Sequence, residues 1–255
     1  MKNQNLFSVV DKIVLVTGAS RGIGKALAIG FANAGAKVIC ASSSEGGTQI
    51  TENEIKKNGG IATSIHADLS DFEAVDKMAK AACEIYGDID VLINNAGTIS
   101  RFPAAEYPLN EFTKVIDVNL NSVFLISQIV GQKMLAKNSG KIINIASMLS
   151  YSGGMTVPAY TASKHAITGL TKALANEWAA NNIQVNAIAP GYFETDNTEA
   201  LRNNPERNKE ITKRIPSGEW GQPEQLVGAA IFLASEASSY VNGHILAVDG
   251  GWLAR

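Results

Sequence analysis

The sequence is poor in cysteine and has no long apolar run. Its 255 residues include two cysteines, Cys40 and Cys83, which are too few for a disulfide scaffold or a four-thiolate zinc site. No stretch reaches the 18 or more apolar residues of a transmembrane helix, and the first residues lack the pattern of a signal peptide. We therefore expect a cytoplasmic protein with no bound metal and no membrane segment.

An excess of charge of one sign is also missing. The 22 basic and 24 acidic residues give a formal net charge of −2, so nothing in the charge favours nucleic acid or an anionic membrane as a partner. Hydrophobic residues make up 45% of the chain, which is typical of globular proteins and sufficient for a sizeable core. These features favour a small molecule as the partner.

The sequence does contain a regular series of short apolar segments rich in β-branched residues. Such segments are typical of parallel strands that are buried on both faces. They occupy residues 13–16, 37–41, 61–66, 89–93, 141–146, 183–189 and 244–248. Segments with helical periodicity lie between them, including one that Ser70 is expected to cap in Ser70-Asp71-Phe72-Glu73. This alternation predicts an α/β fold with a doubly wound, seven-stranded parallel sheet.

A glycine-rich loop follows the first expected strand. Its sequence is Thr17-Gly18-Ala19-Ser20-Arg21-Gly22-Ile23-Gly24, and a helix rich in small residues comes next. Glycines permit a tight turn and a close approach of the backbone to a pyrophosphate, whose charge the helix N-terminus favours. A turn that uses glycine for packing alone is the alternative, but the strand–loop–helix context favours a nucleotide site.

No linker or repeat divides the chain. We therefore expect residues 1–255 to form a single dinucleotide-binding catalytic domain of the Rossmann type. The one long segment without an expected strand, at about residues 191–222, is predicted to be an insertion that folds over the substrate.

Four polar residues are candidates for catalysis, although each is ambiguous by itself. Tyr160 and Lys164 are spaced i, i+4 on a helix expected to begin near residue 158, so they share a face, as residues at any amphipathic helix edge would. Ser147 follows the fifth strand, where open α/β sheets bind ligands, but a serine there is often a turn or cap residue. Asn119 falls within an expected helix, where asparagine often faces solvent.

Taken together, these segments resemble the short-chain dehydrogenase/reductase family over essentially the whole chain. The loop has that family's Thr-Gly-x3-Gly-x-Gly spacing, Asn94-Asn95-Ala96-Gly97 follows the fourth strand, and Tyr160-Thr161-Ala162-Ser163-Lys164 opens a helix. Ser147 and Pro190-Gly191 agree with the family in order and spacing. The resemblance implies an NAD(P)-dependent oxidoreductase with a catalytic tetrad, which consists of Asn119, Ser147, Tyr160 and Lys164.

The chemistry of hydride transfer suggests a role for each member. A ketone that receives hydride also needs a proton, which the Tyr160 hydroxyl can supply, but bringing a tyrosine pKa from about 10 to about 7 requires roughly 4 kcal/mol. The charge of Lys164 would favour the phenolate, and its amine can also hold ribose hydroxyls. Ser147 would hydrogen-bond the substrate oxygen. The resemblance implies that Asn119 anchors a water in the proton relay.

The resemblance also implies which residues bind the cofactor. They are Gly18, Ser20, Arg21, Gly22, Ile23 and Gly24 in the phosphate loop, Asp68 and Leu69 at the adenine, Asn95, Ala96 and Gly97 along the middle, Pro190, Gly191, Phe193 and Thr195 at the nicotinamide, and Tyr160 and Lys164. A helix-entry role for Asp68 and an ordinary turn at residues 190–195 are the alternatives.

The end of the second strand indicates which cofactor is used. An acidic residue there selects NAD, whereas an uncharged residue with a nearby arginine accommodates the 2′-phosphate of NADP. The chain has Ser42 and Ser43 at this point and Arg21 beside the phosphate loop, although Glu45 is close by. NADP is therefore favoured and NAD is possible.

Several stretches, including Ala175-Asn176-Glu177-Trp178-Ala179 and the C-terminal 250–255, are similar to family members that act on deoxy-keto sugar acids such as 2-dehydro-3-deoxy-D-gluconate. The carboxylate of such a substrate needs a cationic partner, for which Arg101, Arg202 and Arg207 are the candidates. Arg202 and Arg207 lie among glutamates, so a solvated helix face is their alternative. A 3-oxoacyl-acyl-carrier-protein reductase and a non-catalytic NAD(P) sensor are the alternative functions.

The helices at about 110–137 and 160–180 are apolar on more than one stripe, as at Val123-Phe124-Leu125-Ile126. Family members commonly associate through such helices, so the resemblance implies a homotetramer. A helix fully covered by its own core is the alternative.

Overall fold

The protein is built around one parallel sheet. The computed structural model describes residues 5–255; residues 1–4, part of the segment expected to lack a signal peptide, lie outside this description. The described residues form seven strands: β1 (Ile13–Thr17), β2 (Lys37–Ser42), β3 (Ile61–His66), β4 (Val91–Asn94), β5 (Gly140–Ile145), β6 (Ile183–Pro190) and β7 (Ile245–Val248). Their order is β3-β2-β1-β4-β5-β6-β7, and all neighbours are parallel. The predicted fold class is confirmed.

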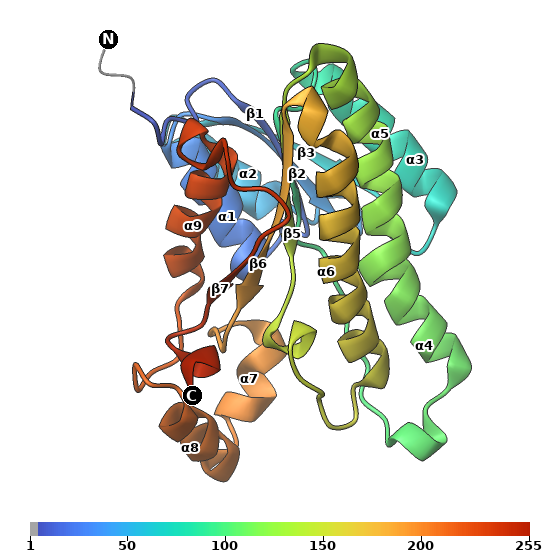
Figure 1. Cartoon of the computed structure of the whole chain (residues 1–255), viewed down its shortest axis with the longest axis vertical. Helices are drawn as coiled ribbons and strands as arrows, with labels where there is room; N and C mark the ends of the chain where they lie inside the picture. The colour runs from blue at the N-terminus through green and yellow to red at the C-terminus, as the bar shows by residue number, and fades with distance from the viewer. Residues whose placement is uncertain (1–4) are drawn as a thin grey trace.

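Helices cover both faces of the sheet (Figure 1). The described chain has α1 (Gly22–Asn33), α2 (Gln49–Lys57), α3 (Phe72–Ile85), α4 (Leu109–Ile116), α5 (Ser122–Lys137), α6 (Pro158–Trp178), α7 (Asp196–Arg202), α8 (Pro205–Arg214) and α9 (Val227–Ala234). Helices α1, α2 and α9 lie on one face, and α3, α5 and α6 lie on the other. Because both faces are covered, every residue of β5 and β6 is buried, which explains why their sequences are largely apolar.

One helix prediction needs correction, and another helix contains a feature that was not predicted. Asp71, not Ser70, caps α3, because the Asp71 carboxylate accepts hydrogen bonds from the backbone N–H groups of Glu73 and Ala74. The helix expected at about 110–137 is present as α4 and α5, which are joined without a break by a π-helical turn, Asp117–Asn121. A π turn contains one extra residue per hydrogen-bonded turn and is common at functional sites.

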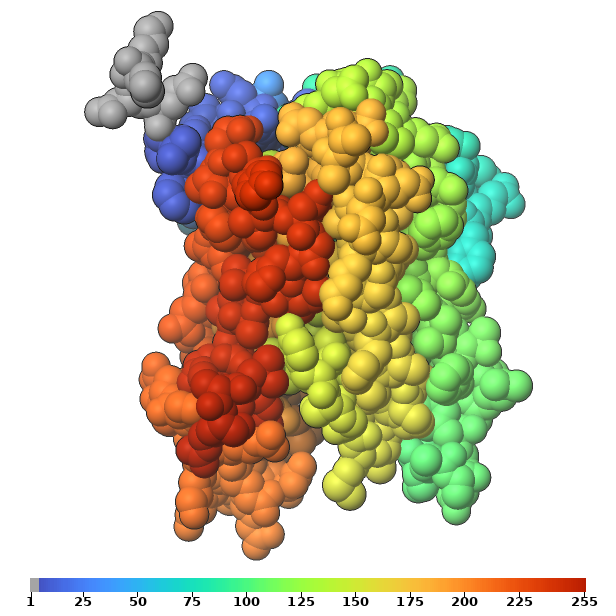
Figure 2. All heavy atoms as spheres, in the orientation of Figure 1, coloured from blue at the N-terminus to red at the C-terminus, as the bar shows by residue number. Residues whose placement is uncertain are grey.

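The segment between β6 and α9 contains α7 and α8, which lie beyond the carboxyl ends of the strands (Figure 1). It packs through Ile211, Ile215 and Trp220 into an apolar cluster that also includes Met148 and Trp252. The C-terminal residues cover the outer side of this region (Figure 2). Within residues 5–255, no helix is long and apolar enough to cross a membrane.

Candidate active site

The phosphate loop lies at the point where the strand order reverses, between β1 and β4. Gly18 and Gly22 have φ values of +67° and +52°, which favour glycine. A Cβ atom on Gly24 would overlap the carbonyl oxygen of Gly18 and the side-chain amide of Asn95. Backbone N–H groups at the start of α1 therefore remain open to a ligand, as the glycine spacing predicts.

Asn95, the residue directly after β4, holds the phosphate loop in place through hydrogen bonds. Its Nδ2 donates hydrogen bonds to the carbonyl oxygens of Thr17 and Gly18 over 2.9 and 3.2 Å. The Thr17 hydroxyl accepts hydrogen bonds from the backbone N–H groups of Asn95 and Ala96, each over 3.0 Å. Thr17 was part of the predicted motif without a role of its own, and its hydroxyl joins the two cofactor segments.

At the end of β2 the structure has no acidic side chain pointing from the strand. Ser42 is largely buried and its hydroxyl donates to the carbonyl oxygen of Ser44 over 2.9 Å, while Ser43 and Glu45 are exposed. Arg21, the residue before α1, is exposed, and its Nε lies 3.4 Å from the carboxylate of Asp196 in α7. The phosphate loop thus contacts the insertion directly.

Asp68 and Leu69 follow β3. Leu69 is buried, while Asp68 is exposed and accepts hydrogen bonds from the backbone N–H and the hydroxyl of Ser70. These bonds, the one from the backbone first, lower the pKa of Asp68. The helix-entry alternative for Asp68 therefore has direct structural support, and the carboxylate also lies at the ligand edge of the sheet.

Ser147 and Tyr160 come together at the carboxyl end of β5. Ser147 begins the 3₁₀ turn Met148–Ser150, and its Oγ accepts a hydrogen bond from the backbone N–H of Leu149 over 3.1 Å. Tyr160 lies in the first turn of α6, which starts at Pro158 as predicted. Burial raises the pKa of Tyr160, while a hydrogen bond with Ser147 and the positive charge of Arg101 act to lower it.

Lys164 lies one turn further along α6 and is buried. Its Nζ donates a 2.6 Å hydrogen bond to the carbonyl oxygen of Ile145 and lies 5.5 Å from the centre of the Tyr160 ring. Burial lowers the pKa of Lys164 to about 8, because the charged amine has lost its hydration. A Cβ on Gly97 would lie 3.9 Å from this Nζ and 3.3 Å from the Asn119 Oδ1, so these three residues are neighbours.

Asn119 is buried in the π turn rather than facing solvent. Its Oδ1 accepts a hydrogen bond from the backbone N–H of Thr98, and its Nδ2 donates to the carbonyl oxygen of Thr98 and to the Ser163 hydroxyl. The four residues of the predicted tetrad are thus gathered around the ends of β4 and β5. Thr98 and Ser163 had no predicted role, and only the spacing of Ser163 in the tyrosine motif could have indicated one.

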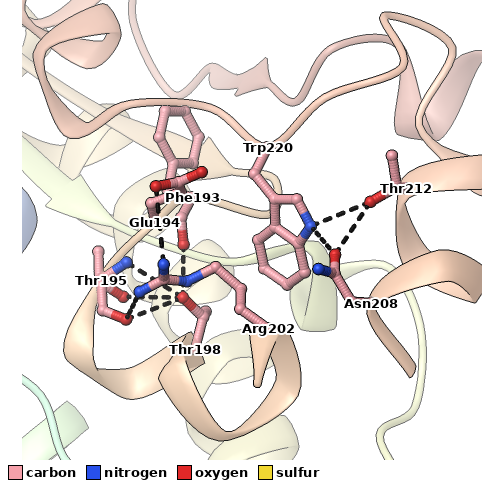
Figure 3. Close-up of polar contacts among 8 residues, drawn as sticks. All are labelled: Phe193, Glu194, Thr195, Thr198, Arg202, Asn208, Thr212 and Trp220. Atoms are coloured by element: carbon pink, nitrogen blue, oxygen red, sulfur yellow. Dashed lines mark hydrogen bonds and ion pairs between the residues drawn. The ribbon is translucent and has the colours of Figure 1, made fainter. Parts of the chain in front are cut away.

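The three predicted arginines differ in their surroundings. Arg101 is exposed after β4, and its charge acts on Tyr160. Arg202 contacts the Glu194 carboxylate at 3.6 Å and donates to the carbonyl oxygen of Thr195 (Figure 3). Arg207 pairs with Glu210 on the same helix at 2.9 Å, as the solvated-face alternative predicted. Arg101 is therefore the arginine that the structure associates with the reacting end of the site.

The segment that follows β6 is fixed by close contacts. Gly191 passes so near the backbone of Asp249 that a Cβ would lie 2.6 Å from its Cα, and Phe193 is buried in the core of the α1 face. Thr195 caps α7 in a reciprocal arrangement with Thr198 (Figure 3). A Cβ on Gly22 would lie 3.5 Å from the Thr195 side chain, so this segment borders the phosphate loop.

The comparisons with known proteins agree with this geometry. The profile of a family described as enoyl-(acyl carrier protein) reductase matches residues 18–253. The chain belongs to the short-chain dehydrogenase/reductase family, and it is therefore an NAD(P)-dependent oxidoreductase that acts on a CH–OH group.

Within this family, several individual proteins are similar to the chain over nearly its whole length. The chain is 52% identical to the 2-dehydro-3-deoxy-D-gluconate 5-dehydrogenase of Bacillus subtilis (strain 168), over 98% of this chain and 97% of that protein. It is 41% identical to the 5-keto-D-gluconate 5-reductase of Escherichia coli (strain K12), over 98% of each. A gluconate 5-dehydrogenase from Burkholderia cenocepacia J2315, solved with NADP and tartrate, superposes with a TM-score of 0.95 at 38% identity, over 98% of each chain.

Proposed function

We propose that the protein is an NADP-dependent dehydrogenase of a deoxy-keto sugar acid, with the C5 hydroxyl of 2-dehydro-3-deoxy-D-gluconate as the reacting group. The observation that carries this proposal is the grouping of Ser147, Tyr160 and Lys164 at the end of β5, with the charge of Arg101 acting on Tyr160. The 52% identical relative supports the substrate, and the NADP in the Burkholderia enzyme supports the cofactor.

The residues present fit a dinucleotide. The positive-φ glycines leave a cradle of backbone at the start of α1, and Gly97 borders Asn119 and Lys164, where a Cβ would lie 3.3 Å from the Asn119 Oδ1. Arg21, Ser42 and Ser43 would receive a 2′-phosphate without repulsion from an acidic residue at the strand end. The remaining parts of the cofactor, from the adenine to the nicotinamide, would be bordered by Asp68, Leu69, Ala96, Phe193 and Thr195. When bound, the nicotinamide would accept the hydride from C5 or return it.

The tetrad would transfer the proton of the substrate hydroxyl. Tyr160 would take the hydroxyl proton as a phenolate during oxidation, and donate it during reduction. Ser147 would hold the substrate oxygen through a hydrogen bond that strengthens as charge develops there. Lys164, whose charge favours the phenolate, and a water anchored by Asn119 would carry the proton onward.

Arg101 would bind the carboxylate of the substrate. A guanidinium can hold a carboxylate through two parallel hydrogen bonds, which fixes the orientation of a small flexible acid. Arg101→Ala should raise KM for the sugar acid by about tenfold or more, and should change KM for an uncharged ketone little, because a charge-assisted hydrogen bond contributes roughly 1.5–3 kcal/mol. Equal losses for both substrates would remove Arg101 from this role.

The domain organisation, the oligomeric state and the cellular compartment are part of the proposal. Residues 1–255 would act as one catalytic domain, in which 191–222 covers the substrate. Four copies would assemble into a tetramer through α4, α5 and α6. The two free cysteines, Cys40 and Cys83, are consistent with the reducing cytoplasm.

One assay tests the proposed function. Oxidation of 2-dehydro-3-deoxy-D-gluconate is measured with NADP⁺ and with NAD⁺, and reduction of an acetoacetyl thioester is measured with NADPH and with NADH. We expect the highest kcat/KM for the sugar acid with NADP, and a smaller preference for NADP in Arg21→Ala. Preferential use of the thioester would instead favour an acyl-carrier-protein reductase.

A further inference from the structure

Ser163, which lies between Tyr160 and Lys164 in sequence, makes a buried connection that has no role in the mechanism above. The side chain is completely buried. Its hydroxyl donates a 2.8 Å hydrogen bond to the carbonyl oxygen of Tyr160 and accepts a 3.1 Å hydrogen bond from the Nδ2 of Asn119. The serine therefore uses its hydrogen and one of its lone pairs on two members of the tetrad.

The connection continues beyond Asn119. The Asn119 Oδ1 accepts from the backbone N–H of Thr98 over 2.7 Å, and its Nδ2 also donates to the carbonyl oxygen of Thr98 over 2.9 Å. Thr98 directly follows Gly97 in the segment after β4. A single chain of hydrogen bonds thus joins that segment, the π turn and the first turn of α6.

We propose that Ser163 is a positioning residue for the tetrad, holding Asn119 and the start of α6 in register so that the phenol of Tyr160 meets the substrate oxygen. The inference rests on the proposed function for the roles of Asn119 and Tyr160. Ser163 itself would touch neither substrate nor cofactor.

Removal of the hydroxyl should therefore act on the rate. Without Ser163 Oγ, the Asn119 amide keeps only its bonds to Thr98, and the carbonyl oxygen of Tyr160 loses its side-chain donor. A displacement of catalytic groups by a fraction of an ångström is sufficient to lower a rate by about tenfold or more. The hydrogen bonds of Ser163 are to the backbone of Tyr160 and to Asn119, and the side chain of Lys164 keeps its own bond to Ile145, so cofactor affinity should change much less than the rate.

The same helix provides a matched control. Thr171, also completely buried, donates a 2.7 Å hydrogen bond to the carbonyl oxygen of Ile167 and accepts a 2.9 Å hydrogen bond from the Nδ2 of Asn144. It lies eight residues after Ser163 and repeats its arrangement, but its asparagine partner belongs to the core and not to the tetrad. Thr171→Val removes an equivalent hydrogen bond away from the site.

The experiment compares Ser163→Ala, Ser163→Thr and Thr171→Val in kcat, KM and Tm. We expect similar decreases in Tm for Ser163→Ala and Thr171→Val. Only Ser163→Ala should lower kcat, by about tenfold, with KM for the NADP cofactor, oxidised or reduced as the reaction requires, within twofold of the wild type. Ser163→Thr, which keeps the hydroxyl, should retain most of the rate. A kcat for Ser163→Ala within twofold of that for Thr171→Val would overturn the proposal.

A second comparison separates positioning from a general loss of structure. In an Asn119→Ala background, Ser163→Ala should have no further effect on kcat, because the partner through which Ser163 acts is already gone. The same proportional decrease in both backgrounds would contradict the inference. All ratios are measured with whichever substrate the wild type uses, the sugar acid oxidised at C5 with NADP⁺ or the acetoacetyl thioester reduced with NADPH, so failure of the proposed substrate leaves this test intact.

Discussion

At the residue scale, the site removes two ionisable groups from solvent, Tyr160 in part and Lys164 almost completely, with opposite consequences. Burial raises the pKa of Tyr160 and lowers that of Lys164 to about 8, because in each case the charged form loses hydration. In the free protein, Lys164 donates to the carbonyl oxygen of Ile145 rather than to the phenol. A phenolate at neutral pH therefore needs positive charge nearby, which Lys164, Arg101 and the bound cofactor would supply together.

The role of the phenol can be tested by removing one atom. Tyr160→Phe should abolish nearly all turnover, because general acid–base catalysis typically contributes about 10²- to 10⁴-fold. NADPH affinity, measured by cofactor fluorescence, should change little, since the ring is kept. A decrease in kcat of less than tenfold would mean that another group carries the proton.

Lys164 should reduce the stability of the fold at neutral pH. Its pKa is about 8 in the folded protein against an ordinary 10.5, so the cost of burying the charge is complete below pH 8 and disappears as the pH rises towards 10.5. At 1.36 kcal/mol per unit this cost is about 3 kcal/mol, and loss of the bond to Ile145 offsets roughly 1–2 kcal/mol of it in Lys164→Met. The inactive variant should be more stable than the wild type in urea at pH 7, with a smaller difference at pH 9.5. Lower stability of Lys164→Met at pH 7 would contradict this account.

At the scale of elements, the loop between β1 and α1 is the most sensitive to added volume. Gly24→Ala should lower both the free energy of unfolding, by about 1–3 kcal/mol, and the affinity for NADPH, because the new methyl group overlaps the Gly18 carbonyl and the Asn95 amide. Urea unfolding and cofactor fluorescence would measure the two effects. Gly228→Ala in α9 is the control: apart from its own helix backbone and its chain neighbours, nothing lies within 4 Å of the new Cβ, so this variant should be slightly stabilised. Equal changes in the free energy of unfolding and in NADPH affinity for the two variants would show that steric overlap at Gly24 is not their cause.

Sequence patterns predicted best those strands whose residues are apolar because both faces of the sheet are buried. β5 and β6 are buried throughout, so their apolar segments could be recognised without tertiary information. The π turn around Asn119 could not be recognised, because one extra residue in a turn leaves the helical composition of 109–137 unchanged. The capping of α3 was assigned one residue too early, since both Ser70 and Asp71 are good caps.

The contacts of the arginines also show what could not be predicted from the sequence. Arg202 and Arg207 were equal candidates in sequence, but Arg202 contacts Glu194 and Thr195, whereas Arg207 remains on an exposed helix face with Glu210. The Arg207–Glu210 pair is local to α8 and follows from helical spacing, whereas the contacts of Arg202 depend on how α7 packs, about which periodicity carries no information. Ser163 illustrates the converse, because its motif was visible but its contact with Asn119 was not.

At the scale of the whole molecule, the exposed surface of α5 bears on assembly. Of the apolar group at 123–126, Val123 and Ile126 are buried in the protein's own core, while Phe124 is 44% exposed. We expect a tetramer by light scattering at micromolar concentration, and Phe124→Glu should reduce the observed mass because it places a charge in the contact. Ile50→Glu, on α2 at the opposite face of the sheet, is the control and should remain tetrameric. A monomeric wild type would contradict the proposed assembly.

The strand order also has a consequence for synthesis of the chain on the ribosome. β1 is an interior strand that pairs with β2 on one side and β4 on the other, but β4 ends only at Asn94. A nascent chain that has formed β1, β2 and β3 therefore presents an unpaired edge whose residues Val14, Leu15 and Val16 are completely buried in the finished protein. That edge is available to other nascent chains until about a hundred residues have left the exit tunnel, so chaperone contact is most valuable during this interval.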